Sequence, residues 1–266
     1  MNKKKHIRIA FAGDRKISVD VLAYLISENV FPLALMISHP SRATHADKLV
    51  TLCSNLSSDH ILTGKEFRTV KGIELLKSLN LDFIISIHFP YVFTPSVLDI
   101  PKEGVLNLHP AYLPYNRGWH TPSWAILENT PIGATLHFMD EGIDTGDIVY
   151  QRQLSILPED TADTLYKRIN SLELHVFKEA WPLIHAGDYI RQPQKLHEGT
   201  THNKSDLMQE NIQSLILNKK EEVGNILVRL KALTTNVLDE AAYFKINGVN
   251  YHVRIFITKH EQSDIQ

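Results

Sequence analysis

The segment from Asn107 to Gly118 holds residue types that could carry out chemistry near neutral pH. Asn107 and His109 are two positions apart, so a strand would point both side chains to the same face. Asparagine supplies an amide donor, and histidine can act as an acid or a base. Taken alone, an Asn-x-His pattern is most often a strand end whose polar side chains are hydrogen-bonded, so its function depends on the rest of the chain.

A second polar segment, from Asp140 to Asp147, combines four acidic residues with two glycines. The glycines predict tight turns, and the carboxylates could orient or activate a histidine. A stretch of this composition is most often just a turn. The order and spacing of the two segments together are more specific than either segment alone.

Strand-like and helix-like patterns alternate over the first 150 residues, which is typical of a doubly wound α/β fold. Residues 83–87 are apolar on both faces, as expected for a buried parallel strand. Strand 105–108 leads directly into the first polar segment, and ligands gather at the carboxyl ends of strands in such sheets. The other expected strands are 7–12, 33–38, 133–138 and 148–156, and the expected helices are 18–28, 46–56, 69–79, 121–128 and 161–185.

Helix signals support several of these elements. Ser18 is a candidate N-cap of the first helix, and Thr161 is a candidate N-cap of the long helix that Gly187 can end. The apolar face expected for helix 69–79 consists of Val70, Ile73, Leu76 and Leu79.

The pattern changes after residue 189, so we expect a first domain of residues 1–189 and a small C-terminal α+β domain of residues 190–266. The polar stretch from Gln192 to Ser205 is typical of a connecting loop. Helix 221–233 follows it. Strands 242–246 and 251–258 flank Asn247-Gly248, which is a hairpin signal.

Composition excludes several classes of protein. The chain has 266 residues, of which 43% are hydrophobic and 22% charged, so it is neither a disordered chain nor a disulfide scaffold. Its one cysteine, Cys53, favours a reducing compartment, and the net charge of −2 predicts no bulk attraction to nucleic acid or membranes. No signal-peptide pattern is present, so we expect the cytoplasm. The dinucleotide, P-loop and H-E-x-x-H motifs are all absent.

The two polar segments read N-x-H-P-x-x-L-P-x-x-x-G and D-x-G-x-D-T-G-D, and this pair resembles the formyltransferases that use N10-formyltetrahydrofolate. The resemblance covers about residues 7–185. It implies a Rossmann-like, mostly parallel sheet, with Asn107, His109 and Asp144 as catalytic residues and no metal. The form H-P-A-Y-L-P-Y-N-R-G-W-H is most similar to the sugar nucleotide branch of the family, as is the stretch from Lys231 to Phe244.

The resemblance also implies where the substrates bind. Formyl-folate would lie against backbone groups of two loops, represented by Ile87, His88, Phe89, Asp140, Glu141 and Gly142. The implied acceptor is a nucleotide-linked amino sugar, with dTDP-4-amino-4,6-dideoxyglucose as the first choice, for O-antigen synthesis by a homodimer. Its candidate contacts are Arg15, Lys16, Asn116, Arg117, Trp119, His120, Lys231, Tyr243 and Phe244.

Several of these contacts have a simpler alternative. The cationic turn at Arg15 and Lys16 begins a helix and suits a phosphate, but it could equally be a solvated turn. Tyr243 and Phe244 could stack on a base or simply pack within a strand.

In the implied reaction an amine attacks the formyl carbon. Asn107 and protonated His109 would stabilise the oxyanion, and either His109 or Asp144 could first accept the proton. One alternative is methionyl-tRNA formyltransferase, which would need a basic C-terminal domain. Residues 191–266 carry 10 Lys and Arg against 9 Asp and Glu, which does not favour it. Glycinamide ribonucleotide formyltransferase would leave the C-terminal unit unexplained, and a non-catalytic folate-binding protein would not need the intact catalytic residues.

Overall fold

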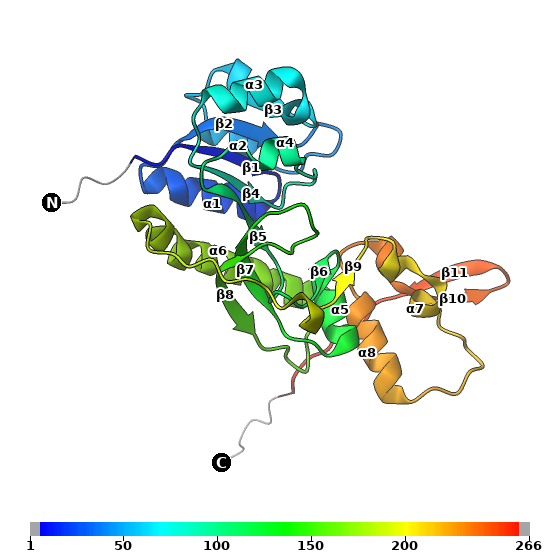
Figure 1. Ribbon diagram of the computed structural model, residues 1–266. Helices are drawn as coiled ribbons and strands as arrows, with labels where there is room; N and C mark the ends of the chain where they lie inside the picture. Colours follow the sequence, from blue (N-terminus) through cyan, green and yellow to red (C-terminus); the bar gives the residue numbers. More distant parts are fainter. Residues whose placement is uncertain (1–5, 261–266) are drawn as a thin grey trace, which may run out of the picture.

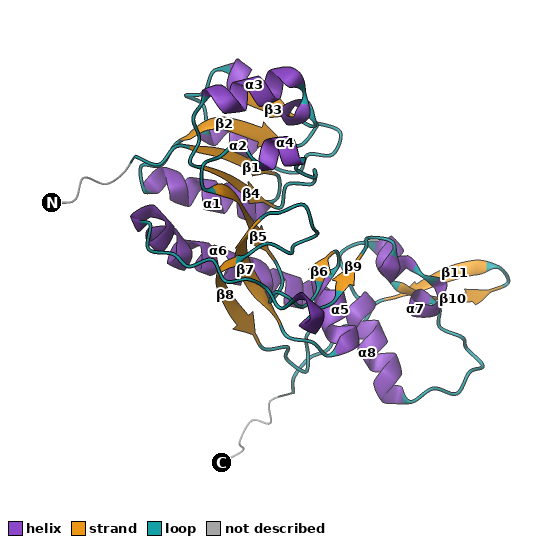
Figure 2. Cartoon of the chain, viewed as in Figure 1, coloured by secondary structure: helices purple, strands orange, loops and turns teal. Residues whose placement is uncertain are grey.

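A seven-stranded sheet forms the centre of the protein, whose computed structural model describes residues 6–260 (Figures 1 and 2). Its strands are β1 (Ile9–Gly13), β2 (Pro32–Ile37), β3 (Ile61–Thr63), β4 (Phe83–Ile87), β5 (Gly104–His109), β7 (Ile132–Phe138) and β8 (Ile148–Leu154). Their order is β3-β2-β1-β4-β5-β7-β8, parallel from β3 to β5 and antiparallel at β7 and β8. The expected α/β fold is confirmed.

Helices cover both faces of the sheet (Figure 2). The long helices are α1 (Lys16–Ser27), α3 (Val70–Ser78) and α6 (Ala162–Ala186), and the shorter ones α2 (Ala46–Leu52), α4 (Pro95–Leu98) and α5 (Thr121–Glu128). One buried cluster joins α1 and α6 to Ile85 and Ile87, while a second joins α3 and α4 to Ile84. Successive residues of β4 therefore serve opposite faces, which is why the strand reads as apolar throughout.

The ends of the helices differ in part from the expectations. Thr161 caps α6 by accepting from the Thr164 N–H, and Gly187 ends the helix in the left-handed region, as predicted. Ser18 is not the N-cap of α1, because Arg15 occupies that position and the Ser18 hydroxyl donates to its carbonyl. Val70 is not part of a buried face, since it is 74% exposed in the first turn of α3.

The C-terminal part contains the short α7 (Glu210–Gln213), the helix α8 (Val223–Leu233) and the hairpin of β10 (Ala242–Ile246) and β11 (Val249–Val253). The predicted hairpin turn at Asn247-Gly248 is confirmed. Trp124 of α5 packs with Leu233 and Ala242, so this part rests on α5 rather than on the sheet. Figure 1 shows the hairpin projecting away from the sheet.

The stretch expected to be a connecting loop is in fact paired with the α/β core. Gln192 forms a β-bridge with Ile148 at the start of β8. Farther on, β9 (Thr201–His202) pairs with β6 (Arg117–Gly118), which lies within the first polar segment. The polar composition of residues 192–205 suggested a linker. The sequence does not reveal their pairing, because their hydrogen-bond partners are distant in sequence.

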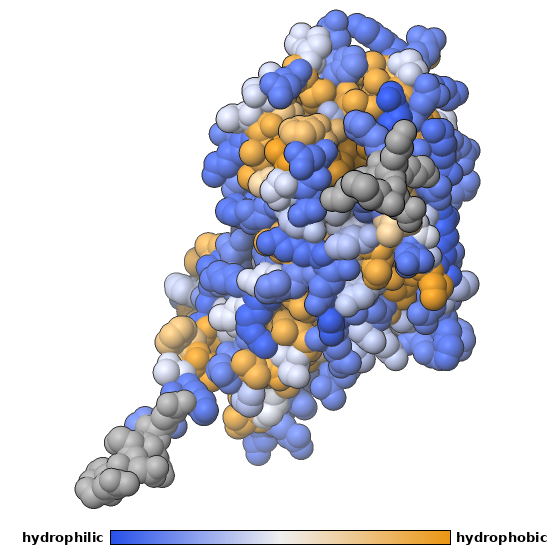
Figure 3. All heavy atoms as spheres, turned by 90° about the vertical axis from the view of Figure 1, so that its left-hand side faces the viewer, coloured by the Kyte–Doolittle hydropathy of each residue, from blue (hydrophilic) through white to orange (hydrophobic). Residues whose placement is uncertain are grey.

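The surface on the left-hand side of Figure 1 mixes hydrophilic and hydrophobic residues (Figure 3). Among residues 6–260, none of the helices has the length and apolar character needed to cross a bilayer.

Removing Phe177 tests the packing of α6 on the sheet. Its ring is fully buried and stacks on Trp181 at 5.8 Å between centroids. We expect Phe177→Ala to lower the free energy of unfolding by about 3–5 kcal/mol in chemical denaturation, because a large cavity remains. Leu183→Ala, on the same helix at a residue that is 41% exposed, is the control and should cost less than about 1 kcal/mol. Equal losses would show that α6 does not carry this part of the core.

Candidate active site

Two neighbouring strands supply the side chains at the centre of the site. Asn107 and His109 lie on β5, and the antiparallel register pairs Asn107 with His137 of β7. The Asn107 Nδ2 lies 3.2 Å from His137 Nε2. The shared face predicted for Asn107 and His109 therefore also holds a second histidine, which sequence analysis did not select. The sequence signal that could have identified His137 is a histidine within a mostly apolar strand, shortly before the acidic segment.

Asp144 lies between the two imidazoles. Its Oδ2 is 3.5 Å from His109 Nε2, and its Oδ1 is 3.6 Å from His137 Nε2. The Gly118 N–H donates to Oδ2 at 2.9 Å. The structure thus brings the two polar segments together, because the turn that follows β7 carries Asp144 back to His109 and Gly118.

The charges of this group are set by burial and by its neighbours. Burial lowers the pKa of His109, and the Asp144 carboxylate only partly opposes this shift. Burial alone would raise the pKa of Asp144, but His109, His137 and the Gly118 N–H together hold it well below its usual range. Near pH 7 the site therefore holds an ionised carboxylate beside a neutral His109, which can accept a proton.

Hydrogen bonds fix the orientation of His137. Its Nδ1 is 2.7 Å from the Phe138 carbonyl, which can only accept, so Nδ1 carries a proton. Its Nε2 lies near both Asn107 Nδ2, at 3.2 Å, and Asp144 Oδ1, at 3.6 Å. The Asn107 amide has two hydrogens, so at least one of them remains available for a ligand.

The loop that carries Asp144 is held from outside the two segments. Asp144 has a φ of 53°, and the turn is stabilised by Asp140, which accepts from the Gly142 N–H and the Thr145 hydroxyl. Gln194 donates to the carbonyls of Asp144 and Gly146 at 2.9 and 2.6 Å. A residue from the expected linker thus positions the carboxylate.

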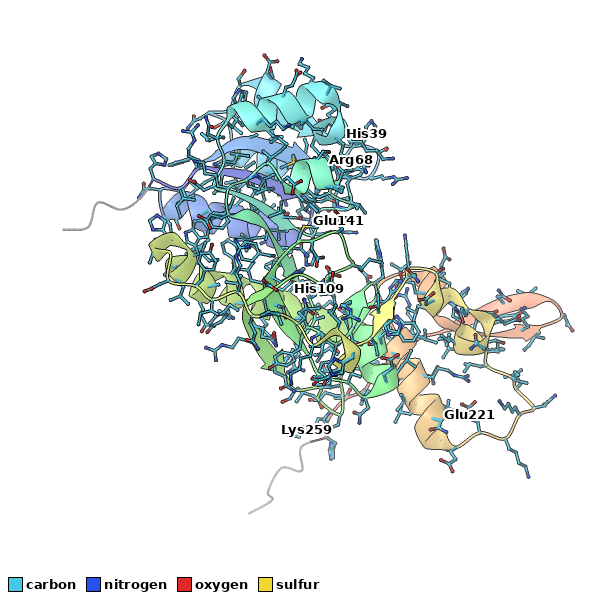
Figure 4. All side chains as sticks on the ribbon, viewed as in Figure 1. His39, Arg68, His109, Glu141, Glu221 and Lys259 are labelled. Carbon is cyan, nitrogen blue, oxygen red and sulfur yellow. The ribbon has the colours of Figure 1, made fainter. Side chains whose placement is uncertain are left out.

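A cavity of about 420 Å³ opens over Asn107 and His109. His88, Phe89 and Pro90 after β4 form one wall, and Tyr166 of α6 lies on another. The C-terminal part closes it with Thr235, Asn236, Val237 and Glu240. Figure 4 shows His109 near the middle of the molecule, with Glu141 between it and the end that holds Arg68.

The structure brings only some of the predicted acceptor contacts to this cavity. Arg15, Trp119 and His120 line it, and half of the Trp119 surface is exposed. Asn116 is fully buried and donates to Thr130 and Pro131, outside the cavity lining.

The remaining predicted contacts also have partners elsewhere. Arg117 holds Thr201 and the Leu196 carbonyl, and Lys16 pairs with Asp20. Lys231 donates to the Pro158 carbonyl. Tyr243 and Phe244 face His252 and Tyr251 within the hairpin.

The residues predicted to hold folate lie in two loops. His88 and Phe89 line the cavity, whereas Ile87 is part of the core beneath it. Asp140, Glu141 and Gly142 lie in the turn before Asp144. Gly142 is required there, because a Cβ would come within 2.0 Å of Thr145 Oγ1.

A protein-family model described as "Formyl transferase" matches residues 8–181. The chain belongs to the formyl transferase family. It is 27% identical over 248 residues to methionyl-tRNA formyltransferase of Syntrophus aciditrophicus, covering 91% of this chain and 77% of that protein. It is 30% identical over 178 residues to dTDP-4-amino-4,6-dideoxyglucose formyltransferase of Mycobacterium tuberculosis, covering 66% of this chain and 73% of that protein.

A solved structure extends the similarity into the C-terminal part. It is an N-formyltransferase from Helicobacter canadensis in complex with folinic acid and dTDP-3-aminofucose. The TM-score is 0.68 at 23% identity, and the match covers 92% of this chain and 86% of that one. The formyltransferase therefore has the family fold, and buried His109 with the partly buried Asn107 and Asp144 forms its candidate catalytic group.

Acid titration tests the buried charge of Asp144. A carboxyl whose folded pKa is depressed stabilises the fold above its unfolded pKa of about 4, and this contribution is lost as the pH falls through the folded value. We expect Asp144→Asn to be less stable than wild type at pH 7, by a difference that shrinks toward pH 2. Urea denaturation at several pH values measures it. A difference that is constant from pH 7 to pH 2 would contradict the ionised state.

Proposed function

We propose that this formyltransferase moves a formyl group from N10-formyltetrahydrofolate to the amine of a nucleotide-linked amino sugar. The preferred acceptor is dTDP-4-amino-4,6-dideoxyglucose or a close analogue. The observation that carries the proposal is the cavity, which joins the Asn107–His109 edge to residues 235–240 of the C-terminal part. A small acceptor can be enclosed there beside the reacting groups.

The donor site is supported by the two loops at the carboxyl edge of the sheet. Residues 88–90 already line the cavity, and the turn at 140–142 precedes Asp144 directly. The complex of the Helicobacter enzyme with folinic acid and an aminosugar nucleotide supports a common pocket of this kind. A folate in this position would present its formyl group to Asn107 and His109.

The acceptor site is supported by the residues at the mouth of the cavity. Trp119 offers a half-exposed ring on which a base could stack, and Lys204 lies 5.3 Å from the ring centroid. Arg15 also lines the cavity and can face the diphosphate. The sugar would then lie between these groups and His109.

We assign a separate role in the reaction to each of the three residues. The free amide hydrogen of Asn107 faces the formyl oxygen and stabilises it as negative charge develops, which is worth about 3–4 kcal/mol in well-studied oxyanion sites. Neutral His109 takes a proton from the attacking amine. Asp144 holds the imidazole and stabilises the imidazolium that forms. No step requires a metal.

A tRNA acceptor is the main alternative, and the similarity to the methionyl-tRNA formyltransferase of Syntrophus supports it. Residues 191–266 carry 10 Lys and Arg against 9 Asp and Glu, so this part offers little attraction for the RNA backbone. We therefore favour the sugar. We also propose that the enzyme acts in the cytoplasm as a homodimer, and that its product serves surface polysaccharide synthesis.

Product analysis tests the function. The purified protein is incubated with formyl-folate and a panel of dTDP- and UDP-linked amino sugars, with methionyl-tRNA as the competing acceptor. We expect a mass increase of one formyl group, about 28 Da, on a dTDP-linked sugar. Formylation of the tRNA alone would overturn the sugar assignment.

Substitution of His109 tests the mechanism. We expect His109→Gln to keep the fold and to lower kcat by roughly 10²–10⁴, because the proton acceptor is lost. Steady-state kinetics and thermal melting are measured on the same preparation. His60→Gln is the control, since His60 bonds the Leu33 carbonyl and is not part of the cavity lining. Near-normal kcat in His109→Gln would contradict this role.

A further inference from the structure

A second imidazole–carboxylate pair lies beside the first. His88 Nε2 is 2.7 Å from Oε1 of Glu173, which is on α6 and fully buried. A carboxylate can only accept, so Nε2 carries the proton and Nδ1 is left as an acceptor. Among residues 6–260, no protein partner is recorded for Nδ1. His88 is part of the cavity wall, as is His109.

The backbone turns His88 toward this partner. Ser86 pairs with Asn107 in the β4–β5 register and shares its face of the sheet. Strand alternation would place residue 88 on that same face. Instead, His88 has a φ of 51° and reaches α6, which packs on the opposite face. A left-handed conformation is uncommon outside glycine, and here it accompanies the contact of the His88 ring with Glu173.

Glu173 depends on His88 for charge compensation. Its second oxygen, Oε2, is buried without a hydrogen-bond partner in the described part of the chain. A buried carboxylate in this state is costly unless a donor shares its charge. Glu173 therefore fixes which ring nitrogen of His88 faces the cavity as an acceptor, as the buried aspartate of a Ser-His-Asp triad fixes the tautomer of its histidine.

The chemistry of the reaction requires two proton transfers. An alkyl amine arrives mostly as an ammonium ion near pH 7 and must lose one proton before its nitrogen can attack. The nitrogen then bonds to the formyl carbon, and the bond from that carbon to the donor nitrogen breaks. The second proton moves from the amine to the departing nitrogen, so one proton in all is released to solvent.

We propose that His88, held by Glu173, accepts the first proton from the acceptor's ammonium group, while His109 and Asp144 transfer the second. The ammonium N–H bond breaks, its electron pair stays on nitrogen, and the proton joins His88 Nδ1. Glu173 then faces an imidazolium, and the proton leaves to water at the cavity mouth. Glu173 is a positioning residue, since it acts through His88. The inference rests on formyl transfer to an amine, as in the proposed function.

The charged groups around His88 come from several elements. Glu173 contacts it from α6. Tyr166 of α6, Arg15 before α1 and His109 at the end of β5 line the same cavity. Burial, and then the charge of Glu173, raise the pKa of Tyr166, so this hydroxyl stays protonated. Glu173 is the carboxyl group in direct contact with the His88 ring.

The pH dependence of kcat/KM distinguishes this role from a structural one. We expect His88→Gln to lose on the order of 10–100-fold at pH 7, in the lower range for a positioned base. The loss should shrink to a few-fold above the pKa of the acceptor amine, where the amine arrives neutral. Added imidazole should restore activity to His88→Ala at pH 7. A deficit that is the same at every pH, without rescue, would overturn the proposal.

Glu173→Gln tests the positioning role. We expect it to reproduce the pH-dependent deficit of His88→Gln, and the double variant to lose no more than either alone. Glu179→Gln is the control on the same helix, because Glu179 is exposed and pairs with Arg152. Additive losses in the double variant would contradict coupling of the two residues.

Nitrogen NMR of the histidine rings needs no acceptor. We expect the neutral His88 ring to carry its proton on Nε2, and Glu173→Gln to weaken that preference. A ring protonated on Nδ1 would overturn the proposal, since that atom could not accept. If wild type formylates only the tRNA, the sugar assignment fails while the same kinetic and NMR tests still decide the role of His88.

Discussion

The buried carboxylate of Asp144 is the constraint around which the site is built. A lone buried charge would be strongly unfavourable, so the chain must bring compensating groups to it. His109 and His137 lie on either side, and the Gly118 N–H supplies a direct hydrogen bond. These groups come from β5, β7 and β6, so the charge can be accommodated only when those elements are assembled.

The antiparallel register determines where the Asp144 loop begins. β5 ends with His109, which pairs with Thr135 in the middle of β7. β7 then runs back along β5, so that His137 pairs with Asn107. The turn that follows β7 folds back, and its Asp144 reaches both His109 and His137. One short loop thereby meets two histidines from neighbouring strands.

Much of the site could be predicted because the residues are close in sequence. Asn107 and His109 share a strand face by alternation, and the glycine-rich segment around Asp144 is recognisable as a turn. His137 and Glu173 could not be placed in this way. Each lies inside a regular element, and its role depends on strand register or on the side of α6 that meets the sheet. Long-range contacts of this kind leave no local spacing.

The same limit applies to the predicted linker and to several acceptor contacts. Residues 192–205 are polar, and their pairing with β6 and β8 involves partners dozens of residues away. The family resemblance implied Asn116 and Arg117 as acceptor contacts because they follow the catalytic strand. Their hydrogen bonds to Thr130 and Thr201 instead hold the loop in place. Burial of such groups depends on the tertiary fold rather than on residue type.

The clamp formed by Gln194 has a consequence for recombination between relatives. A chimera joined just after α6 would receive its amide donor from one parent and the Asp144 loop from the other. It would also take β6 from one parent and β9 from the other. These strands fit closely, because a Cβ on Gly118 would come within 2.3 Å of the His202 carbonyl oxygen. A crossover placed beyond His202 keeps both contacts within one parent. A C-terminal segment exchanged to alter acceptor preference should therefore begin after His202, about a dozen residues beyond the change in composition at residue 189.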